Sequence, residues 1–104
     1  MKNINVTNVT VVRVYITETS KLLEKVFSYL KDEAKVRGVT VFRAISGYGD
    51  NKKTHTASLV DLSLDLPLVI EFFDEKDKTV PIIEHLNSIL KPEHIIFWDA
   101  KSNS

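Results

Sequence analysis

The residues best placed to do chemistry lie between positions 46 and 56. This least apolar stretch inside the chain reads Ser46-Gly47-Tyr48-Gly49-Asp50-Asn51-Lys52-Lys53-Thr54-His55-Thr56. Glycines let successive backbone N–H groups converge on one cluster of oxygen atoms, and lysines supply mobile positive charge. The stretch therefore indicates a loop that can bind an anion, with Tyr48 able to stack on a base or to cap the edge of the core. Taken alone, the same composition also fits a surface loop with turn glycines.

This spacing excludes the Walker P-loop and the phosphate-binding loop of the Rossmann fold. The stretch lacks the second spacing of a Walker loop, and no helical pattern follows it directly. Arg13 and Arg43 offer a further route to a phosphate, from a neighbouring subunit, although ion pairing at an interface is the more common role for such arginines.

The other titratable residues form no recognisable catalytic or metal-binding set. The chain has no cysteine, which excludes thiolate zinc sites and cysteine nucleophiles. His55, His85 and His94 show no ligand spacing, so a structural or solvated role fits each of them, and His55 is the best candidate for a base or a ligand. Because paired carboxylates and nucleophile–base arrangements are absent, we predict no catalytic residue and no metal site.

The first half of the chain predicts a strand and then a helix. Residues 9–16 are dense in β-branched side chains, which favours a strand. Apolar residues then recur at helical spacing over 22–34. Thr19 or Ser20 can cap this helix, and Gly38 stands where a left-handed residue is expected after its end.

The middle of the chain predicts two strands joined by a long loop. A second strand covers 39–45. After the polar loop, residues 60–65 alternate between apolar and polar side chains, as in a short strand or arm with one wet side. A strong strand follows over 66–73, with Pro67 at its start, where no ladder amide is lost.

The last third predicts a second helix and a final strand. Either Asp74 caps a helix kinked at Pro81, or Thr79 caps a shorter one. A strand over 94–100 and a polar tail over 101–104 complete the chain.

The order of these elements is β-α-β-β-α-β, with a helix in both crossovers. This order predicts an α+β, ferredoxin-like sandwich, in which two helices cover one face of an antiparallel sheet. A sheet with one face in water should alternate cleanly between apolar and polar residues, but the main strands carry apolar residues on both faces. The second apolar set therefore predicts contact with another subunit. The charged residues available to pair across that contact are Arg13, Arg43, Glu71 and Asp99.

The composition is that of an ordinary globular protein. The 104 residues fit a single domain, and 14 basic side chains balance 14 acidic ones, which argues against a nucleic-acid-binding surface. No apolar run approaches the roughly 18 residues of a membrane span. The first residues show no secretory signal, so we expect a cytoplasmic protein that is not inserted in a membrane.

Several segments resemble one known family in matching order. They are Val-Tyr-Ile in the first strand, Arg-Ala-Ile-Ser-Gly-Tyr-Gly at 43–49, His-Thr-Ala at 55–57 and Asp-Leu-Pro-Leu-Val-Ile-Glu at 65–71. This pattern is similar to the uncharacterised PII-like family, which is related to the PII nitrogen-regulatory signalling proteins. The segment 46–56 looks like the start of the PII T-loop. The similarity runs from about Val11 to Ala100, which is nearly the whole chain.

The resemblance implies a ferredoxin-like homotrimer that binds an adenine nucleotide in clefts between subunits. Gly47, Tyr48 and Gly49 match the loop base that would lie against the nucleotide, and Lys52 or Lys53 resembles the basic residue of the PII loop. Matched with the neighbouring serine and the His-Thr pair, the implied nucleotide-binding residues are Ser46, Gly47, Tyr48, Gly49, Lys52, Lys53, His55 and Thr56.

Two departures from the PII pattern limit which nucleotide and which modification we expect for this chain. PII proteins hold the polyphosphate with a glycine-rich loop before the last strand, whereas here that stretch is only Lys91-Pro92-Glu93-His94. The resemblance therefore favours AMP or ADP over ATP. The tyrosine that some PII proteins carry for uridylylation has no counterpart, so that modification is not transferred.

We therefore expect a non-enzymatic trimeric sensor that signals through a loop over 46–65 to a protein partner, of which a membrane transporter is a common kind among PII relatives. The main alternative is a divalent-metal-handling trimer similar to the cation-tolerance proteins, against which the missing cysteines and scattered histidines count. A phosphoryl-transfer enzyme lacks a nucleophile–base arrangement. An RNA-binding domain lacks the aromatic and basic strand signature.

Overall fold

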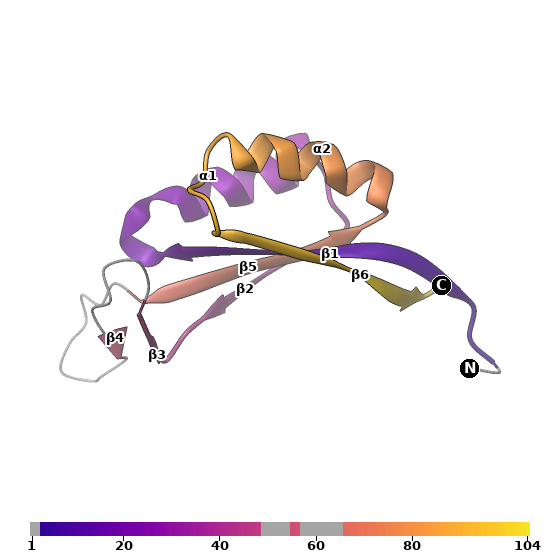
Figure 1. The fold of residues 1–104 in the computed structure, drawn as a ribbon, viewed down its shortest axis with the longest axis horizontal. Coiled ribbons are helices and arrows are strands. Elements are labelled where there is room, and N and C mark those ends of the chain that lie inside the picture. The colour runs from indigo at the N-terminus through magenta and orange to yellow at the C-terminus, as the bar shows by residue number, and fades with distance from the viewer. Residues whose placement is uncertain (1–2, 49–54, 57–65) are drawn as a thin grey trace.

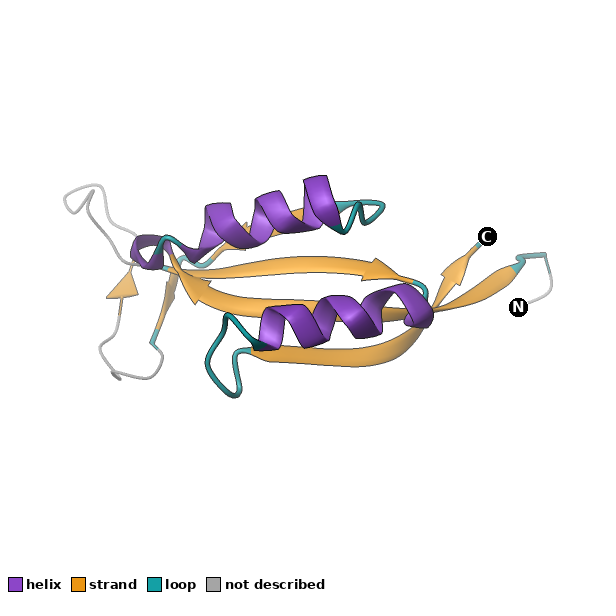
Figure 2. Ribbon diagram, turned by 90° about the horizontal axis from the view of Figure 1, so that it is seen from above, coloured by secondary structure: helices purple, strands orange, loops and turns teal. Residues whose placement is uncertain are grey.

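The protein is a four-stranded antiparallel sheet with two helices on one face (Figure 1). The computed structural model describes residues 3–48, 55–56 and 66–104. The sheet order is β2-β5-β1-β6, and its strands are β1 (Val6–Thr17), β2 (Val39–Arg43), β5 (Pro67–Asp74) and β6 (Ile95–Asn103). The helices are α1 (Leu22–Ser28) and α2 (Lys76–Asn87). Both helices lie over the sheet when it is seen from above (Figure 2), which confirms the predicted ferredoxin-like class.

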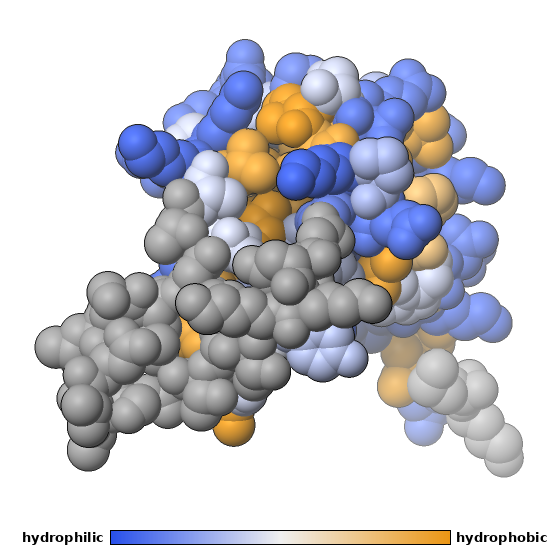
Figure 3. Space-filling model, turned by 60° about the vertical axis from the view of Figure 1, so that its left-hand side comes forward, coloured by the Kyte–Doolittle hydropathy of each residue, from blue (hydrophilic) through white to orange (hydrophobic). Residues whose placement is uncertain are grey.

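The core lies between the helices and the sheet face that they cover. Alternate residues of β1 and β5 point into it, where they meet the inner residues of α1, the turn after it and α2. Its buried members are Val12, Val14, Ile16, Val26, Leu30, Leu68, Ile70, Phe72, Ile82, Leu86 and Leu90. The outer surface of the helix layer is mostly hydrophilic (Figure 3).

The N-cap residue of α1 is Lys21, and Ser20, one of the two predicted capping residues, bonds to the first amide of the helix from the position before it. A 3₁₀ turn over Glu18–Ser20 leads into it, and Lys21 takes a left-handed conformation with φ of 62°. The hydroxyl of Ser20 accepts a hydrogen bond from the N–H of Leu22 at 3.3 Å, which supplies a partner for one free amide of the first turn. The side chain of Thr19, the other predicted cap, lies outside the described structure.

The end of this helix corrects the role predicted for Gly38. After α1 the chain continues as a π-helical turn over Tyr29–Glu33, in which the N–H of Ala34 donates to the carbonyl of Tyr29 at 2.9 Å. The left-handed residue that follows is Lys35, with φ of 55°, and Gly38 does not have a positive φ. The wider π turn closes the helix at Glu33, so the reversal comes three residues before the glycine.

Helix α2 begins close to the first predicted start, and the alternative start at Thr79 was wrong. Glu75 is the N-cap residue, and the N–H of Glu75 donates to Oδ1 of Asp74 at 2.8 Å. Thr79 is buried inside the helix, where its hydroxyl donates to the carbonyl of Lys76 at 3.1 Å. The helix continues through Pro81.

Strands β1 and β6 run further than predicted. Residues 101–103, predicted as a polar tail, belong to β6 and pair with the start of β1, where Thr7 lies opposite Ser102 and Val6 opposite Asn103. The N–H of Ser104 also donates to the carbonyl of Asn5 at 2.8 Å. The result is a two-stranded extension that reaches beyond the helices toward both termini (Figure 1).

The predicted long loop after β2 contains a short ladder. Strand β2 ends at Arg43, two residues before the predicted end, and two-residue strands β3 (Ser46–Gly47) and β4 (His55–Thr56) pair with each other. In Figure 1 they lie beside the sheet, on the side away from the helices. The predicted arm over 60–65 lies outside the described residues.

Candidate functional site

The base of the loop is built where three sheet strands end or begin. The N–H of Ala44 donates to the carbonyl of Pro67 at 2.9 Å, which ties the end of β2 to the start of β5. The N–H of Glu18 donates to the carbonyl of Leu66 at 3.1 Å, which ties the end of β1 to the same point. Leu66 itself is fully buried. These hydrogen bonds therefore fix the place where the chain leaves the end of β2 and returns to the start of β5.

Gly47 is needed at this base because of space. In the β3–β4 ladder Ser46 lies opposite Thr56 and Gly47 opposite His55. A Cβ atom on Gly47 would lie 3.1 Å from Cγ of Pro67, closer than most real Cβ contacts. Gly47 has no positive φ, so its backbone conformation is open to other residues. The absence of a side chain lets the ladder lie directly against the start of β5.

The residues beside Gly47 are strongly exposed. Tyr48 is 66% exposed and Ile45 is 80% exposed, although both are large and apolar. An exposed ring at a loop base is available to stack on a flat ligand or to pack on another subunit.

An arginine–glutamate pair closes the same end of the sheet. Nε of Arg43 lies 2.8 Å from Oε1 of Glu18, and Nη2 lies 3.1 Å from Oε2. The guanidinium and the carboxylate therefore form a bidentate ion pair. The sequence singled out Arg43 but missed Glu18. No local pattern marks Glu18, because its partner Arg43 lies 25 residues further along the chain, at the end of β2.

Of the predicted nucleotide-binding residues, the structure brings four together and places a fifth beside them. Ser46, Gly47, His55 and Thr56 form the β3–β4 ladder, and Tyr48 follows it directly. The remaining three, Gly49, Lys52 and Lys53, lie outside the described residues.

The turn before β6 lies at the same end of the sheet. The carbonyl of His94 accepts a hydrogen bond from the N–H of Tyr15 at 2.9 Å, close to the end of β1. Glu93 takes a left-handed conformation with φ of 68°, which closes the turn within a few residues. The turn is therefore short, as the sequence indicated.

The sheet face that the helices leave uncovered is apolar around a single charged pair. We call it the open face, and its residues are Thr40, Phe42, Val69, Glu71, Phe73, Val11, Arg13, Tyr15, Ile96 and Trp98. Phe42 and Trp98 are 46% and 42% exposed, which is unusual for side chains of this size. The hydrogen bond from Arg13 to the Glu71 carboxylate raises the pKa of Arg13 above its ordinary value.

The histidines and acids show no metal centre in the part of the chain that is described. No group of three or more His, Asp or Glu residues converges there. The ring of His85 stacks on Tyr29 with centroids 4.1 Å apart and planes 25° from parallel, which joins α2 to the turn after α1. His85 therefore has a structural role, one of the two roles that the sequence left open for it.

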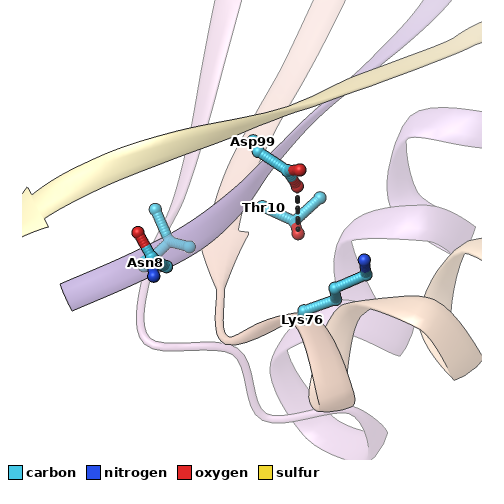
Figure 4. A pocket seen from close by; sticks show the side chains of 5 residues that line it. Asn8, Thr10, Lys76 and Asp99 are labelled. Carbon is cyan, nitrogen blue, oxygen red and sulfur yellow. Dashed lines mark hydrogen bonds between the residues drawn. The ribbon is translucent and has the colours of Figure 1, made fainter.

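A hollow of about 360 Å³ lies at the opposite end of the sheet (Figure 4). It is lined by Asn8, Val9 and Thr10 of β1, Lys76 of α2 and Asp99 of β6. Thr10 donates to Asp99 at 3.5 Å, the far limit of a hydrogen bond. Thr10 lies seven residues before Thr17, which is roughly 23 Å along an extended strand. The hollow is therefore separate from the loop base.

The comparisons with known proteins identify the family. A family model described as Uncharacterized ACR, COG1993 (DUF190) matches residues 9–102. The chain belongs to the DUF190 family. It is 38% identical over 78 residues to a UPF0166 protein of Aquifex aeolicus (strain VF5), which is 71% of this chain and 74% of that relative. A second UPF0166 protein of the same organism is 29% identical over 69 residues, 66% of this chain and 72% of its own length.

The fold of this DUF190 protein is that of PII-like signalling proteins. CPII from Thiomonas intermedia K12, in a structure bound to ADP and bicarbonate, matches with a TM-score of 0.68 and 18% identity, over 97% of this chain and 92% of that chain. A Thermus thermophilus protein described as PII-like matches with a TM-score of 0.66 and 14% identity, over 96% and 92%. CPII bound to ADP, AMP and bicarbonate matches with a TM-score of 0.63 and 14% identity, over 96% of each chain.

The helices in the described ranges are too short or too polar to cross a bilayer.

Proposed function

We propose that this DUF190 protein is a cytoplasmic homotrimeric regulator that binds an adenine nucleotide at the loop base. AMP and ADP bind in preference to ATP. Ligand contacts at the loop base order the loop over 46–65 and change what it can dock against, so that a protein partner reads the nucleotide. We assign the protein no catalytic step.

The main support for the proposed trimer is the set of apolar side chains exposed on the open face. A lone protomer would expose Phe42, Phe73 and Trp98 together on one sheet surface, and single globular chains rarely expose an apolar patch of this kind. Three copies that turn their open faces inward bury it. The crevices formed where neighbouring copies meet then lie beside the ends of the strands.

The loop base supports the ligand. The ladder of Ser46, Gly47, His55 and Thr56 presents backbone groups at a fixed position, and the exposed ring of Tyr48 follows it. The short turn before β6 supplies no glycine-rich cradle for a triphosphate. CPII, which shares the fold, has been solved with ADP and AMP.

Isothermal calorimetry with AMP, ADP and ATP tests the proposal. We expect AMP or ADP to bind more tightly than ATP. Failure of all three nucleotides to bind at millimolar concentration contradicts the proposed function.

Lys52→Ala combined with Lys53→Ala should weaken binding of the preferred nucleotide by about tenfold, because the variant removes the mobile positive charge of the loop. The matched control is Lys25→Ala with Lys31→Ala, which removes the same charge from the exposed surface of the helix layer. If the two double variants bind the nucleotide with equal affinity, Lys52 and Lys53 are not part of the binding site.

A further inference from the structure

A charged pair occupies the middle of the open face. Arg13 on β1 lies opposite Glu71 on β5 and Ile96 on β6, and Glu71 lies opposite Thr40 on β2. One flanking row crosses the sheet on one side and consists of Phe73, Val11 and Trp98. The row on the other side consists of Phe42, Val69 and Tyr15.

Arg13 is held in place by groups from the three other strands of the sheet. Its Nε lies 2.7 Å from Oε1 of Glu71. The centre of its guanidinium lies 5.9 Å from the ring centroid of Phe42 and 5.7 Å from that of Trp98, within the range of a cation–π contact. The positive charge therefore stands between two aromatic side chains that come from the two edge strands.

In a single protomer, the Arg13–Glu71 pair and the aromatic side chains around it remain partly exposed to water. An ion pair in water contributes little to stability, and a sheet that faced water would not need aromatic side chains around it. If another molecule covers the open face, both charges lose water and need further hydrogen bonds. A guanidinium has five N–H donors, and the hydrogen bonds to Glu71 and Tyr15 leave some of these donors for a further partner.

We infer that Arg13 of one copy pairs with Glu71 of the next copy across the contact between open faces, and that this exchange selects self-assembly. The face carries one charge of each sign on an otherwise apolar surface, so a rotated copy of the same face is electrostatically complementary to it. An unlike apolar face would leave both charges buried without a new partner. This inference rests on the proposed function, because it requires that the chain assembles with itself.

Charge reversal tests the pairing. Arg13→Glu gives each face two carboxylates, and Glu71→Arg gives each face two guanidinium groups. We expect each variant alone to need at least about a hundredfold higher concentration to assemble, because like charges then meet in a desolvated contact. Sedimentation velocity over a dilution series measures this.

Mixing and recombination distinguish a pairing defect from a folding defect. The double variant Arg13→Glu/Glu71→Arg should assemble by itself, because each face again carries one charge of each sign. When it is mixed with the wild type, the double variant should form no mixed trimers, because a contact between the two kinds of chain would set like charges opposite each other; mixed trimers would show that each charged pair stays within one chain. The matched controls, Lys31→Glu and Glu24→Arg, change the same charges on the exposed helix layer and should assemble like the wild type.

The outcomes separate this inference from the proposed function. If the wild type assembles and the single variants assemble equally well, the inference is overturned while the proposed trimer stands. Loss of assembly that the double variant does not restore also overturns it, and so do mixed trimers of the double variant with the wild type. A wild type that remains a single protomer overturns the proposed function itself.

Discussion

Gly47 shows how one missing side chain can define the loop base. Its backbone is not in a glycine-only conformation, so the requirement comes from the ring of Pro67, 3.1 Å from the position of an added Cβ. The sequence located this glycine in an anion-binding pattern, but it could not reveal the contact with Pro67, which is far along the chain.

Gly47→Ala should cost about 1–2 kcal/mol of stability and weaken nucleotide binding, because either the ladder or the start of β5 must shift. The control is Gly38→Ala, where an added Cβ would meet nothing within 4 Å and φ is not positive. That change should be neutral or stabilise by up to about 1 kcal/mol through the unfolded chain. Urea unfolding and calorimetry on both variants would contradict this account if Gly47→Ala behaved like Gly38→Ala.

Asp74 is a buried carboxylate at the junction of β5 and α2. Burial alone would raise the pKa of Asp74, but the N–H of Glu75 and the charges of Lys78 and Arg37 outweigh burial and lower this pKa below 3.8. Nζ of Lys78 lies 3.4 Å from Oδ2, and Nη2 of Arg37 lies 3.5 Å from Oδ1. The ionised form is therefore favoured by folding.

Asp74→Asn should lower the free energy of unfolding at pH 7 by about 1–3 kcal/mol, because the charge is lost while an acceptor remains. Since the folded pKa is the lower one, the advantage of the wild type is complete above the unfolded pKa, near 3.8, and disappears as pH falls through the folded pKa. Urea unfolding at fixed protein concentration between pH 7 and pH 3 measures the difference. A difference that stays constant across that range would rule out ionisation as its cause.

At the scale of elements, the sequence predicted the type and order of the helices and sheet strands but not their ends. Hydrophobic periodicity identified β1, β5 and both helices, because their inner faces are buried. The ends of β1 and β6 are held by backbone pairing between polar residues such as Thr7 and Ser102, which leaves no hydrophobic pattern to read. The π turn after α1 likewise has no sequence signal.

Removal of residues 101–104 should lower the thermal midpoint by several degrees, because it deletes the partners of Val6 and Thr7. The control replaces Lys101, Ser102 and Asn103 with alanine, which keeps the backbone pairing. We expect that variant to melt close to the wild type. If the truncated protein is as stable as the wild type, these residues are a polar tail after all.

At the scale of the whole molecule, the open face was visible in the sequence as strands that are apolar on both sides. Two helices cover only one face, and the structure leaves Phe42, Phe73 and Trp98 exposed on the other. The sequence also named Arg13 and Glu71 as charges available to pair, but only the strand register places them opposite each other. The family resemblance supplied the trimer and the nucleotide, which no periodicity could have given.

Sedimentation velocity of the wild-type protein at micromolar concentration, with and without ADP, tests the central claim most directly. Assembly through the open faces predicts one discrete species with the mass of three chains under both conditions. A species with the mass of one chain, unchanged by ADP, would contradict it.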